Sequence, residues 1–318
     1  MSKVGGRRNF GYGKTLHFAV RSALDERFGP GRYGTQAAHH ERLGPFVDFL
    51  RQCSIRDFCQ VAPDHLLFYA RLLRLAVDSG ELATATVVNR LSSVNVLMRT
   101  LRGNMDIWIS PRSVLGARSQ VRLVPPLGIE IEQVDALAQA IRAAGHESLA
   151  CLVRLCRCFG LRFREASLLG LKRAVAQAQR SGTIDIREGT KGGRGRRVER
   201  RVPVDEHGMA VLVEALRCAS PETSRLVPEG WTYAKWFKYA HRVYRKFASP
   251  AGLSPKFHDL RAAYACARYE QMAGCAAPVF VGHRQATRPD DAAAREVVAR
   301  ELGHGRSSVT NAYCGGVR

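Results

Sequence analysis

The sequence predicts a mainly α-helical protein of two domains, the first all-helical and the second α+β with one small β-hairpin. Three observations lead to this fold class. Apolar residues recur with helical spacing along most of the chain. A stretch rich in Gly and Pro, residues 102–126, interrupts that pattern. Farther on, two short strand-like runs flank a basic, glycine-rich turn. The length of 318 residues is sufficient for two separate cores.

The first domain is predicted to span residues 34–111. Its helices are expected at Gln36–Cys53, Asp64–Ser79 and Val87–Leu101. Pro63 suits the first turn of the second helix, because proline lacks an N–H that this turn would leave unbonded. Thr84 or Thr86 suits the N-cap of the third helix, since its hydroxyl can accept a bond from a free backbone N–H.

Residues 1–33 precede this domain and are rich in Gly and Arg around one expected helix at Lys14–Phe28. We expect a basic N-terminal segment. Two interpretations stay open: an arm that binds a partner, or a flexible basic tail.

The second domain is predicted over residues 127–318, after a linker at 112–126. The runs Thr183–Arg187 and Arg197–Val204 predict a β-hairpin around Gly192-Gly193-Arg194-Gly195. The helices expected in this domain are Glu132–Ala144, Glu147–Phe159, one from about Arg164, His207–Cys218, Thr232–Phe247, His258–Met272, Ala292–Leu302 and a short one that ends at Tyr313.

The charge balance indicates the class of partner. Lys and Arg total 49 against 28 acidic residues, which gives a net charge of +21, and most of the excess is arginine. The guanidinium group binds phosphate through two parallel hydrogen bonds, so a nucleic-acid backbone is the expected partner. A solvated basic surface or a protein that binds anionic lipid is the alternative.

Other features exclude several classes. No apolar run is long enough to span a membrane, and no secretory signal follows the basic N-terminus, so a cytoplasmic protein is expected. The nine cysteines form no C-x-x-C pair and are interpreted as free, mostly buried thiols. The glycine-rich turn lacks the spacing of an ATP-binding loop. Asp290-Asp291 is interpreted as a solvated pair at a helix start, so no metal and no cofactor are expected.

Four motifs in the second domain carry candidate chemistry. Arg162 lies in Gly160-Leu161-Arg162-Phe163-Arg164-Glu165, between two expected helices. Lys191 follows Thr190 on the hairpin. His258 and Arg261 are three positions apart, and therefore on one helix face. Leu302-Gly303-His304 is followed nine positions later by Tyr313. Each motif alone is common, whereas their order and placement together are specific.

This set resembles the tyrosine recombinase, or phage-integrase, family, whose pattern is G-L-R-x-x-E, a hairpin lysine, H-x-x-R, L-G-H and a tyrosine nucleophile. The resemblance covers residues 126–318, and the helical part before them looks like the family's core-binding domain. It implies a site-specific DNA recombinase or integrase of a mobile genetic element. In the family, a 3′-phosphotyrosine intermediate links enzyme and DNA, and neither metal nor ATP is used.

The resemblance assigns catalytic roles to six residues, Arg162, Lys191, His258, Arg261, His304 and Tyr313. The two arginines suit neutralisation of the phosphate oxygens in the transition state. Tyr313 is the expected nucleophile and Lys191 the expected proton donor to the leaving 5′ oxygen. His258 is the candidate proton acceptor for the tyrosine, and His304 a donor to the phosphate. Glu165 is expected to support the site without reacting.

The chain departs from the family pattern in the spacing between Arg261 and His304, where extra residues lie around Ala273–Asp291. A second histidine, His283 in Val281-Gly282-His283, therefore stands near the usual position. His304 is preferred because its distance to Tyr313 fits the pattern. The apolar run 276–281 is expected either to contact a neighbouring protomer or to pack on its own domain.

The partners implied are double-stranded DNA at specific recombination sites and a homotetramer on paired sites, with a free monomer. Thr86, Asn89 and Arg90, at the start of the third helix, are the candidate DNA-binding residues of the first domain. Two alternatives stay open: a DNA-relaxing enzyme like the type IB topoisomerases, and a catalytically inactive DNA-binding regulator of the same fold. The target sequence and the biological role are not encoded in these motifs.

Overall fold

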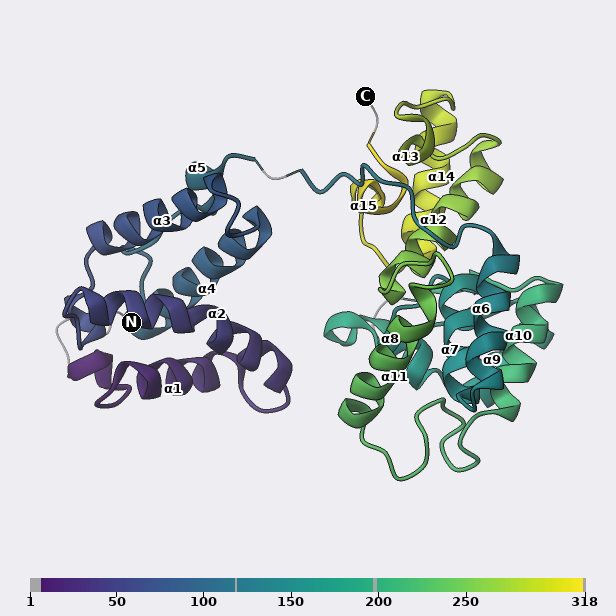
Figure 1. The fold of residues 1–318 in the computed structure, drawn as a ribbon, viewed down its shortest axis with the longest axis horizontal. Coiled ribbons are helices and arrows are strands. Elements are labelled where there is room, and N and C mark those ends of the chain that lie inside the picture. The colour runs from purple at the N-terminus through teal and green to yellow at the C-terminus, as the bar shows by residue number, and fades with distance from the viewer. Residues whose placement is uncertain (1–6, 118, 197–198, 317–318) are drawn as a thin grey trace. The chain divides into compact units, whose positions relative to one another are not determined.

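The computed structural model describes residues 7–117, 119–196 and 199–316. It divides into two compact units, Met1–Ser119 and Gln120–Arg318, each with a separate hydrophobic core. The boundary falls inside the range 112–126. The predicted mainly α fold class is confirmed, because the described residues are largely helical and form one small antiparallel sheet (Figure 1).

The first unit is built from five α-helices in its described part. They are α1 (Leu16–Phe28), α2 (Tyr33–Gln52), α3 (Pro63–Asp78), α4 (Thr84–Arg102) and α5 (Pro111–Leu115), with short 3₁₀ turns η1 (Arg8–Gly11) and η2 (Phe58–Gln60). Helix α1 packs against α2 and α4, and its apolar side chains share their core. The described part of the basic N-terminal segment is therefore folded into this unit, whereas residues 1–6 lie outside the described residues.

The ends of two helices test the capping predictions. Pro63 is the first residue of α3, as predicted. Helix α4 begins at Thr84 with Ala83 at its N-cap, and no side chain caps it. The threonine cap was therefore wrong by one position: Thr84 already has helical geometry, and a cap residue must lie outside the first turn.

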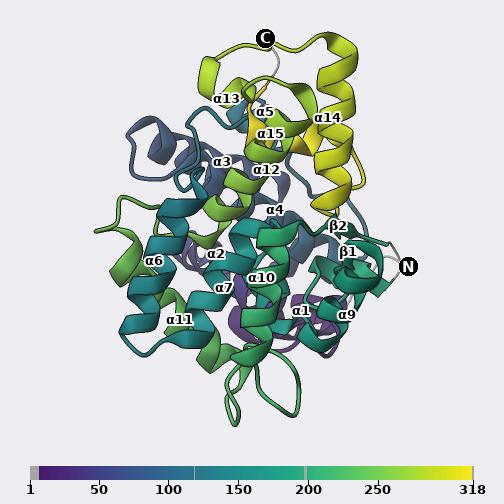
Figure 2. The same ribbon diagram turned by 90° about the vertical axis from the view of Figure 1, so that its right-hand side faces the viewer.

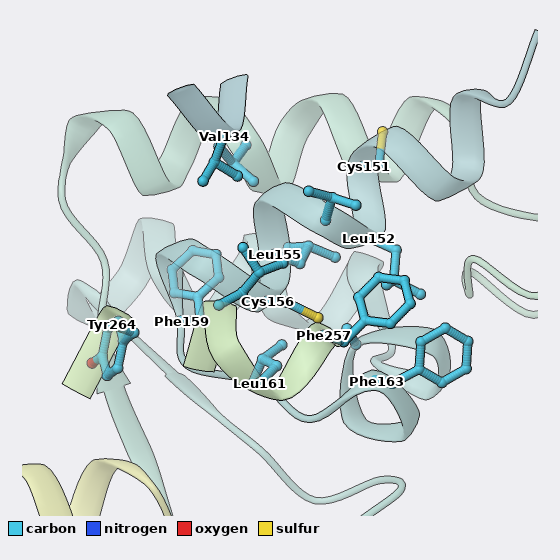
Figure 3. Packing of buried hydrophobic residues seen from close by; sticks show 14 of the residues in the cluster. Val134, Cys151, Leu152, Leu155, Cys156, Phe159, Leu161, Phe163, Phe257 and Tyr264 are labelled. Carbon is cyan, nitrogen blue, oxygen red and sulfur yellow. The ribbon is translucent and has the colours of Figure 1, made fainter. Parts of the chain in front are cut away.

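The second unit surrounds helix α7 (Glu147–Cys158), whose side chains gather with Phe257 of α12 in Figure 3. Its other α-helices are α6 (Ile131–Ala143), α8 (Phe163–Leu168), α9 (Leu171–Ser181), α10 (Glu206–Arg217), α11 (Tyr233–Ala248), α12 (Phe257–Ala273), α13 (Pro278–Val281), α14 (Arg288–Glu301) and α15 (Asn311–Cys314). Two 3₁₀ turns, η3 (Lys191–Arg196) and η4 (Ser307–Thr310), complete it. Helices α6, α10 and α12 pack directly on α7.

The hairpin is shorter than the sequence predicts. Strand β1 (Thr183–Asp185) pairs antiparallel with β2 (Arg201–Pro203), and Ile184 lies opposite Val202. The turn η3 occupies much of the connection, and Arg197 and Val198 lie outside the described residues. The helix expected from about Arg164 is two helices, α8 and α9, because Leu169 (φ −57°, ψ 127°) and Gly170 (φ −74°, ψ 91°) both depart from helical backbone geometry.

The stretch 273–291 bears on one open alternative and corrects one expectation. Ala277, Pro278 and Val279 are buried and α13 packs on α15, so only Phe280 of this run is a substantially exposed apolar side chain. The run therefore packs on its own unit, which is the second of the two interpretations that the sequence left open. Asp291 is also buried: it pairs with Arg295 at 2.9 Å, so the description of a solvated acidic pair fits only Asp290.

The nine cysteines, all within the described ranges, are free thiols, of which four are buried and Cys59 is exposed. Within the described part of the chain, no helix has both the length and the apolarity needed to cross a membrane.

Candidate active site

Three of the predicted residues meet at one cavity of the second unit. The cavity has a volume of about 530 Å³. Arg162, Lys191 and His304 line it, together with Glu165, Ile186, Thr190, Gly195, Glu199, Arg200, Arg300, Gly303 and Gly305. Four cationic side chains and two carboxylates are in this lining, so the cavity has a net positive charge, which suits an anionic ligand such as a phosphate.

The Gly160–Glu165 motif forms the entry to helix α8. The Glu165 carboxylate accepts the backbone N–H of Arg162 at 2.8 Å and pairs with the Arg162 side chain at 2.6 Å. Gly160 has φ +58°, and a Cβ there would lie 2.5 Å from the ring of Tyr264. Only glycine fits this position, so the glycine of this motif is required by the packing against α12, whereas its arginine is the candidate for the chemistry.

Glu165 is the anionic centre beneath the cavity. Its side chain is fully buried, and it pairs with Arg162, with Arg200 at 2.8 Å and with Arg261 at 3.5 Å. Burial alone would raise the pKa of this carboxyl, but Arg200, Arg261 and Arg162 together outweigh burial and lower the pKa to about 2. Glu165 is therefore ionised at neutral pH and balances part of the arginine charge.

Arg261 is fully buried on α12, where its side chain forms hydrogen bonds with backbone carbonyls. Its guanidinium donates to the carbonyl of Gly160 and, at 2.5 Å, to that of Leu302. Its Nε lies 3.4 Å from the Tyr313 hydroxyl. Burial and then Arg200 lower the pKa of Arg261 to about 10, so it still carries a full charge at neutral pH.

The turn after α14 presents His304, which is half-buried. The backbone N–H of His304 donates to the carbonyl of Ala299 at 2.8 Å, and Gly303 has φ +68°. Burial, with Arg261 and Arg162 next in size, lowers the pKa of His304 to about 4. The imidazole is therefore neutral at pH 7.

Tyr313, on α15, lies immediately behind His304 and is buried. Its hydroxyl is 3.2 Å from His304 Nε2. The same nitrogen is 3.5 Å from Arg261, and because a guanidinium can only donate, this contact favours the tautomer with the lone pair on Nε2. In that tautomer the phenol O–H donates to a neutral histidine, while Arg261 Nε faces the phenol oxygen.

His258 lies beside this group without a described hydrogen bond to the tyrosine. Its ring centroid is 5.4 Å from that of Tyr313. Burial, with Arg261 and Arg162 next in size, lowers the pKa of His258. The sequence placed His258 as the partner of the tyrosine hydroxyl, but in this structure that hydrogen bond belongs to His304. Residue spacing cannot distinguish two histidines that both face one ring.

Lys191 reaches the cavity from η3, on the connection between the two strands. The Thr190 hydroxyl accepts the N–H of Gly195 at 2.9 Å and holds this connection together. His283 is exposed, follows α13 and has its Nδ1 2.9 Å from the carbonyl of Val281. It does not line the cavity. The preference for His304 over His283 thus agrees with the geometry.

Two elements of the site escaped the sequence analysis. Arg200 is buried against Glu165, yet it lies in an arginine-rich run where nothing distinguishes it. Asp259 accepts a 2.5 Å hydrogen bond from Arg122, whose backbone N–H donates to Asn311 two residues before Tyr313. In the sequence, the one sign that Asp259 belongs to the site was its position directly after His258.

No group of three or more His, Cys, Asp and Glu side chains within the described ranges is arranged to hold a metal ion. Of the candidate DNA-binding residues, Asn89 is exposed on α4 of the first unit, and Thr86 and Arg90 are half-buried.

Residues 121–267 match the model of a protein family described as Integrase. The similarity to this family covers a little less than half of the chain. The matched region includes Arg162, Lys191, His258 and Arg261, and it ends before His304 and Tyr313. No curated protein sequence matches the chain.

Solved integrase structures share the fold. A lambda integrase dimer bound to a COC′ core site is 16% identical, with 96% of each chain covered and a TM-score of 0.58. A Tn1549 transposon integrase in complex with transposon right-end DNA is 14% identical, with 95% of this chain and 96% of that chain covered and a TM-score of 0.57. A lambda integrase tetramer bound to a Holliday junction is 16% identical, with 95% and 78% covered and a TM-score of 0.56. At these identities the likeness establishes the fold.

Proposed function

We propose that this chain is a site-specific DNA recombinase that cleaves and rejoins DNA through a 3′-phosphotyrosine intermediate on Tyr313. One observation carries the proposal. The hydroxyl of Tyr313 is hydrogen-bonded to His304, and His304 lines a cationic cavity with Arg162 and Lys191. A nucleophile, a proton acceptor and phosphate-binding cations thus meet at one place, as phosphodiester cleavage requires.

The proposed reaction uses the side chains in turn. Arg162 binds the non-bridging oxygens of the scissile phosphate in the cavity. The Tyr313 proton passes to neutral His304, and the phenolate oxygen attacks phosphorus as the bond to the 5′ oxygen breaks. Lys191 supplies the proton that the leaving 5′ oxygen needs. Because Tyr313 is buried, its hydroxyl must turn toward the cavity when DNA binds.

Rejoining reverses these steps with a different 5′ hydroxyl as the nucleophile. The phosphotyrosine bond keeps the phosphoryl group activated, so the cycle is balanced without ATP. Arginine charges can take the place of a metal ion at the transition state, so we also propose a metal-independent reaction.

The domain roles follow the same proposal. We assign residues 34–111 as the core-binding domain, 112–126 as the linker and 127–318 as the catalytic domain. Asn89, which is exposed near the start of α4, is proposed to contact DNA together with Thr86 and Arg90. A free monomer would assemble as a tetramer on paired sites. A cytoplasmic location is part of this proposal.

The decisive experiment uses a pool of nicked suicide duplexes of random sequence, because the target site is unknown. A recombinase should form a covalent adduct with a small, selectable subset of the pool. Adducts spread over the pool without sequence preference would favour a DNA-relaxing enzyme of the topoisomerase kind. Binding without any adduct would favour an inactive DNA-binding regulator.

The two histidines give a test of the site. His304→Ala should slow single-turnover cleavage by about 100-fold, because the tyrosine loses its proton acceptor. His283→Ala is the matched control: its exposed ring lies outside the cavity, and cleavage should stay within about twofold. The rates are measured on a selected duplex with protein in excess. A larger defect in His283→Ala would show that the site is wrongly assigned.

The net charge of +21 gives a second test. Each neutralised phosphate releases counterions, so the affinity should fall with a log–log slope of about −0.9 per contact. Several contacts would lower the affinity about 100-fold between roughly 50 and 200 mM salt. Fluorescence anisotropy with a labelled duplex measures this slope. An affinity that does not change with salt would remove the argument from net charge, and only the geometry of the site would then support the proposal.

A further inference from the structure

Arg200 is a buried cation that lies outside the six predicted catalytic residues. It immediately precedes β2 and is 3% exposed. A buried guanidinium is costly unless its donors are satisfied and its charge is balanced. Its partners therefore indicate what the arginine is for.

Those partners come from the two motifs that build the site. Nη1 pairs with the Glu165 carboxylate at 2.8 Å, and Nε donates to the carbonyl of Glu301 at 2.5 Å. Nη2 lies 3.5 Å from the carbonyl of Gly160, a long contact. One side chain thus joins the start of α8 to the end of α14.

The end of α14 depends on two arginines. A helix leaves its last carbonyls without partners in the helix. Here Arg200 donates a hydrogen bond to the carbonyl of Glu301, and Arg261 donates one to that of Leu302. The chain then turns at Gly303 into His304. A Cβ on Gly303 would lie 2.9 Å from Arg200 Cδ, so the arginine packs directly on this turn.

The backbone N–H and carbonyl of Arg200 are both hydrogen-bonded, like its side chain. Its N–H donates to Asp185 at 3.2 Å, and its carbonyl accepts from Ile186 at 3.0 Å. The hairpin base is therefore held beside the C-terminal end of α14, where β2 lies in Figure 2. The same hairpin carries Lys191.

We propose that Arg200 is a positioning residue, which holds the Leu302-Gly303-His304 turn against Glu165 so that His304 faces both Tyr313 and the cavity. The inference rests on the proposed function, because it states how His304 reaches the tyrosine. Arg200 acts through His304 and needs no contact with DNA.

The electrostatic surroundings agree with this role. The charged and titratable groups around His304 are Arg162, Arg200, Arg261, Glu165 and Tyr313, with Lys191 and Arg300 on the same cavity. Removal of Arg200 takes away one cation and loosens the turn. Both changes favour the protonated imidazole, so they should raise the pKa of His304.

The test compares Arg200→Met, which keeps the length but no donors, with Arg200→Lys, which keeps the charge. Arg268→Met is the matched control, because Arg268 pairs at 2.8 Å with the side chain of Glu301 and does not reach Glu165 or the cavity. Glu165 retains Arg162 and Arg261 in both Arg200 variants, so the unit should fold, which circular dichroism checks.

Two readouts are used. Single-turnover adduct formation on a selected suicide duplex should fall by about 10–100-fold in Arg200→Met, with DNA affinity unchanged within about twofold. Arg200→Lys should stay at least about 10-fold below the parent, because one ammonium cannot hold both Glu165 and the helix end. In DNA-free protein labelled with ¹⁵N-histidine, the His304 titration midpoint should rise by about one unit in Arg200→Met and not in Arg268→Met.

Three results would overturn the inference: near-normal cleavage in Arg200→Met, full recovery in Arg200→Lys, or an unchanged His304 midpoint in Arg200→Met. If the parent protein forms no adduct with any duplex, the proposed function fails. The titration uses no DNA, so an unchanged His304 midpoint in Arg200→Met would overturn the inference in that case too.

Discussion

Tyr313→Phe is expected to form no covalent adduct with DNA while its DNA affinity stays within about twofold of the parent. The substitution removes only the hydroxyl oxygen. The buried ring keeps its place beside Arg261, whose guanidinium carbon lies 5.8 Å from the ring centroid. Adducts are counted on denaturing gels with the selected suicide duplex, and affinity is measured on the intact duplex.

Tyr264→Phe is the matched control for this prediction. Tyr264 is also buried, on the same helix as Arg261, and its hydroxyl donates to Glu301 at 2.7 Å. Its loss should cost about 1 kcal/mol of stability, as for an ordinary hydrogen bond, and should leave the adduct yield intact. An adduct that persists in Tyr313→Phe and maps to Tyr264 would contradict the assignment of the nucleophile.

The sequence predicted the helices well because each one buries an apolar stripe. Helix α7 was expected at Glu147–Phe159 and spans Glu147–Cys158, and α12 was expected at His258–Met272 and spans Phe257–Ala273. The errors lie where local geometry overrides periodicity. The break at Leu169 and Gly170 splits one expected helix into α8 and α9.

The motifs gave the right residue types but not their pairing. The three-residue spacing of His258 and Arg261 fixes a shared helix face. It does not reveal that the shortest hydrogen bonds of Arg261 go to the backbone carbonyls of Gly160 and Leu302. Nor does it reveal that His304, rather than His258, meets the tyrosine hydroxyl. These contacts depend on how α12, α14 and α15 pack, which no single-element pattern encodes.

Buried charges were the least predictable feature. With 49 Lys and Arg residues, the sequence cannot show which cations are buried. Arg200 lies 35 positions after its partner Glu165, and Asp291 pairs with Arg295 under the loop that precedes Tyr313. Asp291 was expected to be solvated and Arg200 was not singled out, because charged residues usually lie on the surface. Tertiary contacts make these positions exceptions.

Arg261→Ala and Arg162→Ala should both lose cleavage by about 100-fold or more, but only Arg261→Ala should also destabilise the fold. Arg261 is fully buried and satisfies two backbone carbonyls, so its removal leaves acceptors without partners and Glu165 with one cation fewer. The Arg162 side chain is 28% exposed at the cavity and, within the described part of the chain, forms an ion pair with Glu165 alone.

Breaking a buried charge pair costs about 3–5 kcal/mol, so Arg261→Ala should lower the free energy of unfolding by about that amount. Arg162→Ala should lose about 1 kcal/mol or less, because Glu165 keeps Arg200 and Arg261 and the Arg162 backbone N–H still donates to it. Urea unfolding of the DNA-free proteins measures both values. Equal stability of the two variants would mean that Arg261 does not support the site as its contacts indicate. Normal cleavage in Arg162→Ala would instead remove the contact of Arg162 with the phosphate from the proposed reaction, because that contact rests on a side chain that lines the cavity and is 28% exposed.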